Sequence, residues 1–157
     1  MSQSHILLTG AYGFVGSALS KTLQQQRFRL SKVGRASKSL VDDMQHQVDT
    51  IDGATDWTAM LTGIDVVIHL AARVHVMNEE LSDPLSAYRD TNVAGTLNLA
   101  RQSASAGVKR FIFISSIKVN GEQTKAGQPF TADDSPMPED AYGLSKWEAE
   151  QGLLALA

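Results

Sequence analysis

The sequence predicts an α/β domain with a doubly wound parallel sheet. Short apolar segments alternate along the chain with segments of helical periodicity. This alternation is typical of parallel strands joined by right-handed helical crossovers. Two of the apolar segments, 65–72 and 111–116, are apolar on both faces, as buried parallel strands are. The 157 residues are enough for one domain with a substantial core.

A glycine-rich turn joins the first predicted strand, His5–Thr9, to the first predicted helix, Phe14–Gln26. Gly10 allows a positive φ where the chain leaves the strand. Gly13 has no Cβ, so a pyrophosphate could approach the helix N-terminus, where unpaired N–H groups favour an anion. Gly16 would let the helix lie tightly against the sheet. The spacing differs from the older Gly-x-Gly-x-x-Gly fingerprint, and a turn without a ligand stays an alternative.

The first helix and the segments after it form the next part of the predicted fold. Val15, Leu19 and Leu23 recur four apart and predict the inward face of this helix. Arg27–Val33 is predicted as the second strand. Gly34–Gln45 is polar and is predicted as a loop with a helical turn.

The middle of the chain contains the clearest strand. Gln47–Ile51 is predicted as a short third strand, and Thr55–Leu61 as a helix that Thr55 caps and Gly63 ends. Asp65–Ala72 is β-branched and apolar, which predicts a buried parallel strand.

The rest of the chain continues the alternation. The predicted elements are a loop at Val74–Pro84, a long helix at Leu85–Ala106 stopped by Gly107, a strand at Phe111–Ser116, an extended connection at Asn120–Asp140 and a last helix at Ala141–Ala157. One stripe of the long helix is predicted to consist of Tyr88, Asn92, Gly95, Leu99 and Ser103.

Composition excludes several functional classes. A formal net charge of −3 and a pI near 5.7 give no basic surface for nucleic acid. The chain has no cysteine, and its four histidines do not have a metal-ligand spacing, so no metal site is expected. No apolar run is long enough to span a membrane, and no signal peptide is visible. We expect a soluble cytoplasmic protein.

Three strand ends are predicted to meet at one crevice. In doubly wound sheets, ligands bind beyond the carboxyl ends of the strands, where the strand order reverses. The segments Gly10–Gly16, His69–Ala72 and Ser115–Ser116 all follow predicted strands. The sequence therefore predicts a binding site there.

A tyrosine and a lysine lie four apart at the start of the last helix. Tyr142 and Lys146 share one helix face, and the lysine charge would lower the tyrosine pKa toward neutrality. Such a tyrosine could act as a general acid/base. The hydroxyl of Ser116 could bind a reacting oxygen. Each motif alone also fits a solvated helix face or a local backbone contact, and their combination favours chemistry.

These motifs together resemble the extended short-chain dehydrogenase/reductase family, in its branch of nucleotide-sugar epimerases and dehydratases. UDP-glucose 4-epimerase represents this branch. The resemblance covers nearly the whole chain in the right order. The motifs are Thr9-Gly10-x-x-Gly13-Phe14-Val15-Gly16, His69-Leu70-Ala71-Ala72, Thr91-Asn92-Val93-Ala94-Gly95-Thr96, Ser115-Ser116 and Tyr142-x-x-x-Lys146.

The resemblance implies a Rossmann-type NAD(P)-binding domain over residues 1–157 and assigns roles to particular residues. Tyr142 would remove a sugar hydroxyl proton while NAD takes the hydride, Ser116 would hold the hydroxyl, and Lys146 would bind the nicotinamide ribose. The keto intermediate would then turn over and take the hydride back on its other face. The other implied cofactor-binding residues are Gly10, Tyr12, Gly13, Phe14, Val15, Gly16, Arg35, Ile51, Leu70, Ala71, Ala72, Asn92 and Ser115.

Several positions depart from the family pattern. Gly34-Arg35 stands where an NAD enzyme usually has an acidic residue, and an arginine there suits the 2′-phosphate of NADP. The pair that reads the adenine could be Thr50-Ile51 or involve Asp49 or Asp52. Ile117-Lys118 replaces the Asp-Glu pair of the 4,6-dehydratases, which counts against a dehydratase.

Two further functions stay open beside the nucleotide-sugar epimerase. One is an NADPH-dependent reductase of a sugar or another carbonyl, which Arg35 favours. The other is a dinucleotide-binding regulator without chemistry, which intact Ser116, Tyr142 and Lys146 disfavour.

The resemblance also implies what lies beyond this chain. Family members are about twice as long, so we expect a truncation before the C-terminal substrate domain and an isolated piece without activity. A UDP-hexose is the expected substrate. A homodimer is expected through 85–106 and 141–157, which would pack against the same helices of a second copy.

Overall fold

Five parallel strands form one sheet in the computed structural model, which describes residues 3–35, 45–74 and 83–157. The strand order is β3-β2-β1-β4-β5. The strands are β1 (His5–Thr9), β2 (Arg29–Gly34), β3 (Gln45–Gln47), β4 (Val66–His69) and β5 (Arg110–Phe113). Every pairing is parallel, with Leu7 opposite Ser31 and Val67. The order reverses between β1 and β4, so the switch point lies beyond their carboxyl ends.

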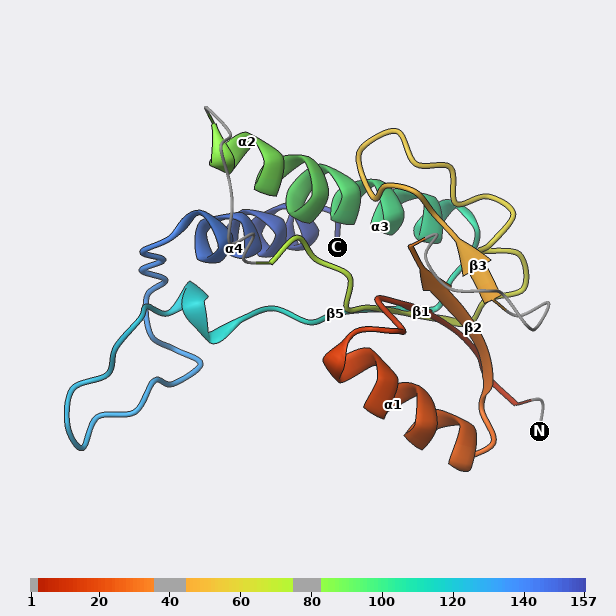
Figure 1. Ribbon diagram of the computed structural model, residues 1–157, viewed down its shortest axis with the longest axis horizontal. Coiled ribbons are helices and arrows are strands. Elements are labelled where there is room, and N and C mark those ends of the chain that lie inside the picture. Colours follow the sequence, from red (N-terminus) through yellow and green to blue (C-terminus); the bar gives the residue numbers. More distant parts are fainter. Residues whose placement is uncertain (1–2, 36–44, 75–82) are drawn as a thin grey trace.

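Helices cover both faces of the sheet (Figure 1). Helix α1 (Phe14–Gln25) lies on one face. On the other face lie α4 (Ala141–Leu154) and a continuous helix made of α2 (Pro84–Arg89), the π-helical segment η1 (Asp90–Gly95) and α3 (Thr96–Ser105). The predicted doubly wound, Rossmann-type fold is therefore confirmed.

The alternation of side chains along β1 divides the core into two clusters. Leu7 points to the face of the long helix and packs with Trp57, Val67 and Leu99. Ile6 and Leu8 point to the opposite face, toward α1. Successive side chains of a strand point to opposite faces, so both clusters follow from one five-residue strand.

The predicted stripe of the long helix faces the protein interior. The five positions Tyr88, Asn92, Gly95, Leu99 and Ser103 are all buried. The helix ends at Ser105. Gly107 follows with a φ of +78°, a conformation in which glycine carries no steric penalty.

Three local predictions are wrong. The third strand is Gln45–Gln47 rather than Gln47–Ile51. Residues 55–57 are irregular and 58–61 form turns instead of a helix. Side chains of α3 hold this backbone in place, because Asn98 and Gln102 each donate to the carbonyl of Thr55 and Gln102 also accepts from the backbone N–H of Trp57.

The third wrong prediction concerns Val15. It does not face the core but is 56% exposed, whereas Leu19 and Leu23 pack against the sheet as expected. The loops predicted at 34–45 and 74–84 lie largely outside the described residues, and Pro84 begins α2.

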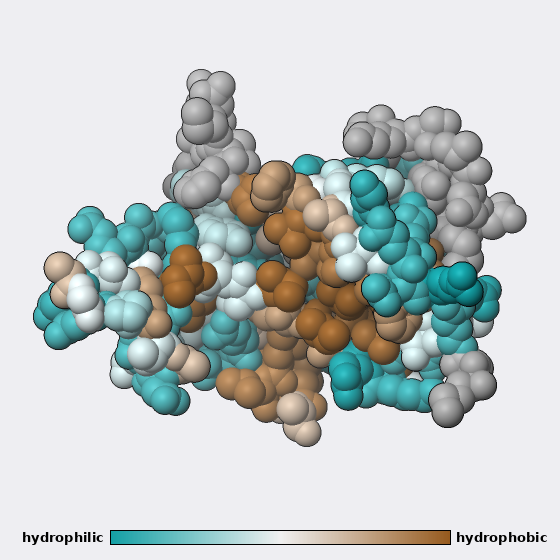
Figure 2. Space-filling view, turned by 90° about the horizontal axis from the view of Figure 1, so that it is seen from below, coloured by the Kyte–Doolittle hydropathy of each residue, from teal (hydrophilic) through white to brown (hydrophobic). Residues whose placement is uncertain are grey.

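The face of the sheet that carries α1 shows apolar surface. Figure 2, seen from below Figure 1, shows hydrophobic residues gathered at the centre of this side. Among the large apolar side chains exposed in the described part of the chain are Phe14, Val15, Phe28 and Ile114.

Candidate functional site

The glycine turn after β1 is packed tightly by its own backbone and by the exit from β4. Gly10 has a φ of +66°, and a Cβ there would lie 2.8 Å from the backbone nitrogen of Ala71. A Cβ at Gly16 would lie 2.0 Å from the carbonyl oxygen of Gly10. Gly16 therefore allows α1 to approach the turn itself, rather than the sheet as predicted.

The N-terminus of α1 is open to a ligand. Gly13 is its N-cap, and no described side chain caps it or places a carboxylate in its first turn. A Cβ at Gly13 would meet only the carbonyl oxygen of Gly10, at 3.3 Å, and Phe14 beside it is 98% exposed. The free N–H groups and the helix dipole favour an anion at this position. The turn thus fits a pyrophosphate group.

Tyr12 connects this turn to the end of β2. A Cβ at Gly34 would lie 2.3 Å from Cδ2 of Tyr12, so only glycine leaves room for the ring. Arg35 follows and is exposed. The structure places both predicted cofactor residues, Tyr12 and Arg35, at the carboxyl end of the sheet.

A buried histidine joins the ends of β1 and β4 to the long helix. His69 is hydrogen-bonded through Nδ1 to the Thr9 hydroxyl (2.6 Å) and through Nε2 to the Thr96 hydroxyl (3.0 Å). The backbone N–H of Ala71 donates to the same Thr9 hydroxyl. Burial lowers the pKa of His69 to about 3, with the charge of Lys146 adding to the effect. His69 is therefore a neutral link that holds the backbone of the 70–72 segment.

Asn92 connects this segment to the helix of the Tyr-Lys pair. Its Oδ1 accepts from the backbone N–H of Arg73 (2.8 Å), and its Nδ2 donates to the carbonyl of Arg73 and to the hydroxyl of Ser145. Ser145 in turn donates to the carbonyl of Tyr142 (2.8 Å). Contacts thus lead from the glycine turn, along the 71–73 segment and through Asn92 and Ser145, to Tyr142. The π-helical segment that carries Asn92 is a feature frequent at functional sites.

Ser116 and Tyr142 come together at the far end of this network. Ser116 caps the short 3₁₀ helix η2 (Ile117–Val119), and its Oγ accepts from the backbone N–H of Lys118 (3.3 Å). Hydrogen bonding with the Ser116 side chain favours the phenolate of Tyr142. Asp140 caps α4 by accepting from the backbone N–H of Gly143 (2.6 Å), which fixes the turn that carries Tyr142.

The predicted tuning of Tyr142 is wrong for the chain by itself. Burial raises the pKa of Tyr142 above its ordinary value, and the charge of Asp140 raises it further, against the opposing effects of Ser116 and Lys118. Lys146 is only 2% exposed, and its ammonium lies 3.8 Å from the centroid of the Phe113 ring. Burial lowers the pKa of Lys146 to about 8.

The remaining predicted site residues have mixed surroundings. The Oγ of Ser115 is buried and has no hydrogen-bond partner within the described residues, so it is free for a ligand. Leu70, Ala71 and Ala72 are half-buried beyond β4. Ile51 belongs to the edge of the core, where its side chain and carbonyl leave no room for a Cβ at Gly95.

Four residues that organise the site are absent from the predicted site residues. They are Thr9, Phe113, Asp140 and Ser145. Asp140 had a visible signal, because it stands where an N-cap is expected, just before the last helix. The others act through contacts with residues distant in the sequence.

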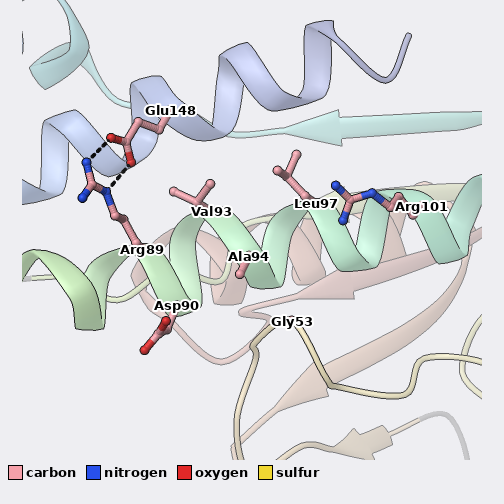
Figure 3. Close-up of a pocket in the computed structure, with 8 residues that line it drawn as sticks. All are labelled: Gly53, Arg89, Asp90, Val93, Ala94, Leu97, Arg101 and Glu148. Atoms are coloured by element: carbon pink, nitrogen blue, oxygen red, sulfur yellow. Dashed lines mark hydrogen bonds and ion pairs between the residues drawn. The ribbon is translucent and has the colours of Figure 1, made fainter.

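A separate pocket lies on the outer side of the helices (Figure 3). Its volume is about 380 Å³, and Arg89 there forms a bidentate ion pair with Glu148. No predicted site residue lines it. The lining residues are Gly53, Arg89, Asp90, Val93, Ala94, Leu97, Arg101 and Glu148.

Residues 3–35, 45–74 and 83–157 contain neither a metal-ligating cluster nor a membrane-spanning helix. They contain no group of three or more histidine or acidic residues arranged to hold a metal ion. No helix within these ranges has the length and apolar character needed to cross a membrane.

The fold is that of a Rossmann-type NAD-binding domain, and it brings Ser116 close to Tyr142, one helical turn from Lys146. Over residues 6–157 the sequence matches the model of the NAD dependent epimerase/dehydratase family. The chain belongs to this family.

Individual relatives agree with this assignment. The chain is 50% identical to a UDP-glucose 4-epimerase of Vibrio cholerae over 153 residues, which cover 97% of this chain and 47% of that protein. It is 34% identical to a 3 beta-hydroxysteroid dehydrogenase/Delta 5-->4-isomerase of Mycobacterium tuberculosis, with 96% and 42% covered. The chain thus spans less than half the length of these relatives.

A solved structure gives the same picture. The structure of MoeE5 in complex with UDP-glucose and NAD superposes with a TM-score of 0.79 at 30% identity, with 97% of this chain and 48% of that chain covered.

Proposed function

We propose that the protein containing this chain is a nucleotide-sugar epimerase that uses NAD and acts on a UDP-hexose. The observation that carries the proposal is the contact network from the glycine turn through Asn92 to Tyr142, with Ser116 beside the phenol. The identity to the Vibrio cholerae enzyme supports the same activity. Residues 1–157 form the NAD(P)-binding domain, and the substrate domain belongs to the rest of the protein.

The chain offers a fitting site for the dinucleotide. The open N-terminus of α1 suits the pyrophosphate, and the unpartnered, buried Oγ of Ser115 lies in the segment that follows β5. We assign cofactor binding to this turn, to 70–72, to Ser115 and to Lys146. Arg35 and Ile51 keep their assignment at the adenosine end. A bound NAD would supply reversible hydride transfer to and from the sugar carbon.

Residues of this chain transfer the proton of the reacting hydroxyl group. Tyr142 takes the proton of the reacting hydroxyl and later gives it back, while Ser116 holds the hydroxyl oxygen. The ammonium of Lys146, which lies 3.8 Å from the centroid of the Phe113 ring, would bind the nicotinamide ribose and favour the phenolate. Asn92 holds the backbone that carries Tyr142.

We also propose that the protein is a cytoplasmic homodimer. The outer surface of η1, α3 and α4 fits such an interface: Val93, Ala94 and Leu97 line the pocket there beside the Arg89–Glu148 ion pair (Figure 3). Gly152 lets α4 approach Leu97, because a Cβ there would lie 2.7 Å from that side chain.

A reductase that uses NADPH on a sugar or another carbonyl is the second candidate. The observation in its favour is that Gly34-Arg35 ends β2 without a carboxylate. A guanidinium at this position suits a 2′-phosphate.

An NMR time course of the full-length protein with NAD and a panel of UDP-hexoses tests the proposal. A second anomeric signal from the 4-epimer is expected, and it should vanish with Tyr142→Phe. If no UDP-hexose of the panel gives a new signal and 4-keto sugars oxidise NADPH, the epimerase proposal would be wrong and the reductase proposal would be supported. Full activity of Tyr142→Phe would contradict both.

A further inference from the structure

We propose that Lys118 and Asp140 form a positioning pair that holds Ser116 and Tyr142 together and balances the charge beside the phenol. The inference rests on the proposed function, since it concerns the acid/base role of Tyr142. It adds two residues that the family motifs named above do not contain.

The first observation is an ion pair that joins the two segments of the site. Nζ of Lys118 donates to Oδ2 of Asp140 (2.5 Å) and to Oε1 of Glu122 (2.7 Å). Lys118 lies in η2, which Ser116 caps, and Asp140 caps the helix that carries Tyr142. The same Asp140 carboxylate therefore ties the first turn of α4 with one oxygen and η2 with the other.

The second observation is a close backbone approach at the same place. A Cβ at Gly143 would lie 2.7 Å from the carbonyl oxygen of Lys118. The residue next to Tyr142 is thus pressed against the residue that donates its N–H to Ser116. Side-chain and backbone contacts together fix the separation of the two hydroxyl groups.

The third observation is the balance of charge around the phenol. Asp140 raises the pKa of Tyr142 and Lys118 lowers it, while burial has the largest effect and Ser116 opposes it. From α2, the Tyr88 ring faces Tyr142 at 6.3 Å between centroids, and η1 contributes the neutral Asn92 through Ser145. Lys146 lies one turn further along α4. Hydrogen bonds to Asp140 and Glu122 raise the pKa of Lys118, so Lys118 stays positively charged at the pH of the reaction.

Two substitutions of opposite charge effect separate the pair from a merely structural role. Asp140→Asn keeps an N-cap oxygen but removes the carboxylate charge beside the phenol and leaves Lys118 paired with Glu122 alone, so the phenol should ionise more easily. Lys118→Met leaves Asp140 uncompensated, so the phenol should ionise less easily. The double variant should lie close to the wild type, and Glu122→Gln serves as the control because Glu122 pairs with Lys118 but does not cap the helix of Tyr142.

The experiment uses the full-length protein with NAD and a UDP-hexose. We expect the acidic limb of the kcat–pH profile to move to lower pH in Asp140→Asn and to higher pH in Lys118→Met. At neutral pH, kcat of Lys118→Met should fall by about three- to tenfold. Glu122→Gln should leave the limb in place.

A second readout keeps the inference separate from the proposed function. Tyrosinate absorbance, corrected with Tyr142→Phe, titrates the phenol without turnover and should shift in the same opposite directions. Shifts in one common direction, or none, would overturn the inference. Opposite shifts without epimerisation would support the pair and refute the epimerase.

Discussion

Lys146 shows how a single residue of the site lowers stability while serving function. Its ammonium is buried against Phe113, and burial lowers its pKa to about 8. A buried charge that forms no ion pair within residues 3–35, 45–74 and 83–157 is unfavourable, and its persistence inside the protein indicates a functional demand. We attribute this demand to the proposed binding of the cofactor ribose by Lys146.

Replacing Lys146 by Met should therefore stabilise the cofactor-free protein at neutral pH while abolishing activity. The pKa is about 8 in the folded protein against an ordinary value of 10.5, so the unfolded state binds more protons between these values and wild-type stability rises with pH. The advantage of Lys146→Met, up to roughly 3 kcal/mol below pH 8, should shrink as the pH rises through this window.

Urea unfolding at a series of pH values measures this difference. Lys21→Met, at an exposed position of α1, is the matched control and should change little. A difference for Lys146→Met that stays constant from neutral to alkaline pH would contradict the account.

His69 gives a pH dependence of the same sign as Lys146, in a more acidic window. It is neutral in the folded protein, where burial lowers its pKa to about 3 from 6.5. Stability from the neutral form is present above about pH 6.5 and is lost as the pH falls toward 3, because the unfolded state takes up the proton first. His69→Leu should cost roughly 2 to 4 kcal/mol at neutral pH, since it strands the Thr9 and Thr96 hydroxyls.

The same variant should lose less stability on acidification than the wild type. Denaturant midpoints between pH 7 and pH 4 measure the two slopes. Parallel curves for the two proteins would show that His69 is not the titrating group.

At the scale of elements, the features that could be predicted are those set by residues close together in the chain. The long helix was predictable because its buried stripe repeats over several turns, and the glycine turn because its conformation restricts residue type. The structure of the 55–61 segment was not predictable, because its backbone groups form hydrogen bonds with Asn98 and Gln102, which lie more than 40 positions away in the sequence. Asn92 was predictable as a site residue only through its motif, since its partners Arg73 and Ser145 come from two other segments.

The glycine turn supports a matched comparison. Gly10 and Gly63 both have positive φ, but a Cβ at Gly10 would strike the Ala71 backbone, whereas one at Gly63 would meet nothing within 4 Å. Gly63→Ala should cost roughly 1 kcal/mol from backbone strain alone, and Gly10→Ala roughly 3 kcal/mol or more. Gly10→Ala should also weaken NAD binding, measured by calorimetry. Equal losses of stability in the two variants would contradict the packing of this turn.

At the scale of the whole molecule, the outer surface of η1, α3 and α4 is the proposed interface of the homodimer. Ala94 is exposed beside the pocket of Figure 3, and Ala18 is exposed on α1. Ala94→Glu should convert the full-length protein from dimer to monomer in light scattering, because it places a charge in the interface. Ala18→Glu should leave the dimer intact. A monomeric wild type, or a dimer that tolerates Ala94→Glu, would refute the proposed interface.

The most direct test of the central claim follows a labelled hydrogen. The full-length protein with NAD is given a UDP-hexose that carries deuterium at the carbon to be inverted, and the product is examined by NMR. If the hydride leaves and returns within the site while Tyr142 moves the proton, the epimer keeps its deuterium, and Tyr142→Phe forms it at least about a hundredfold more slowly. An epimer that exchanges its deuterium with solvent would contradict the account.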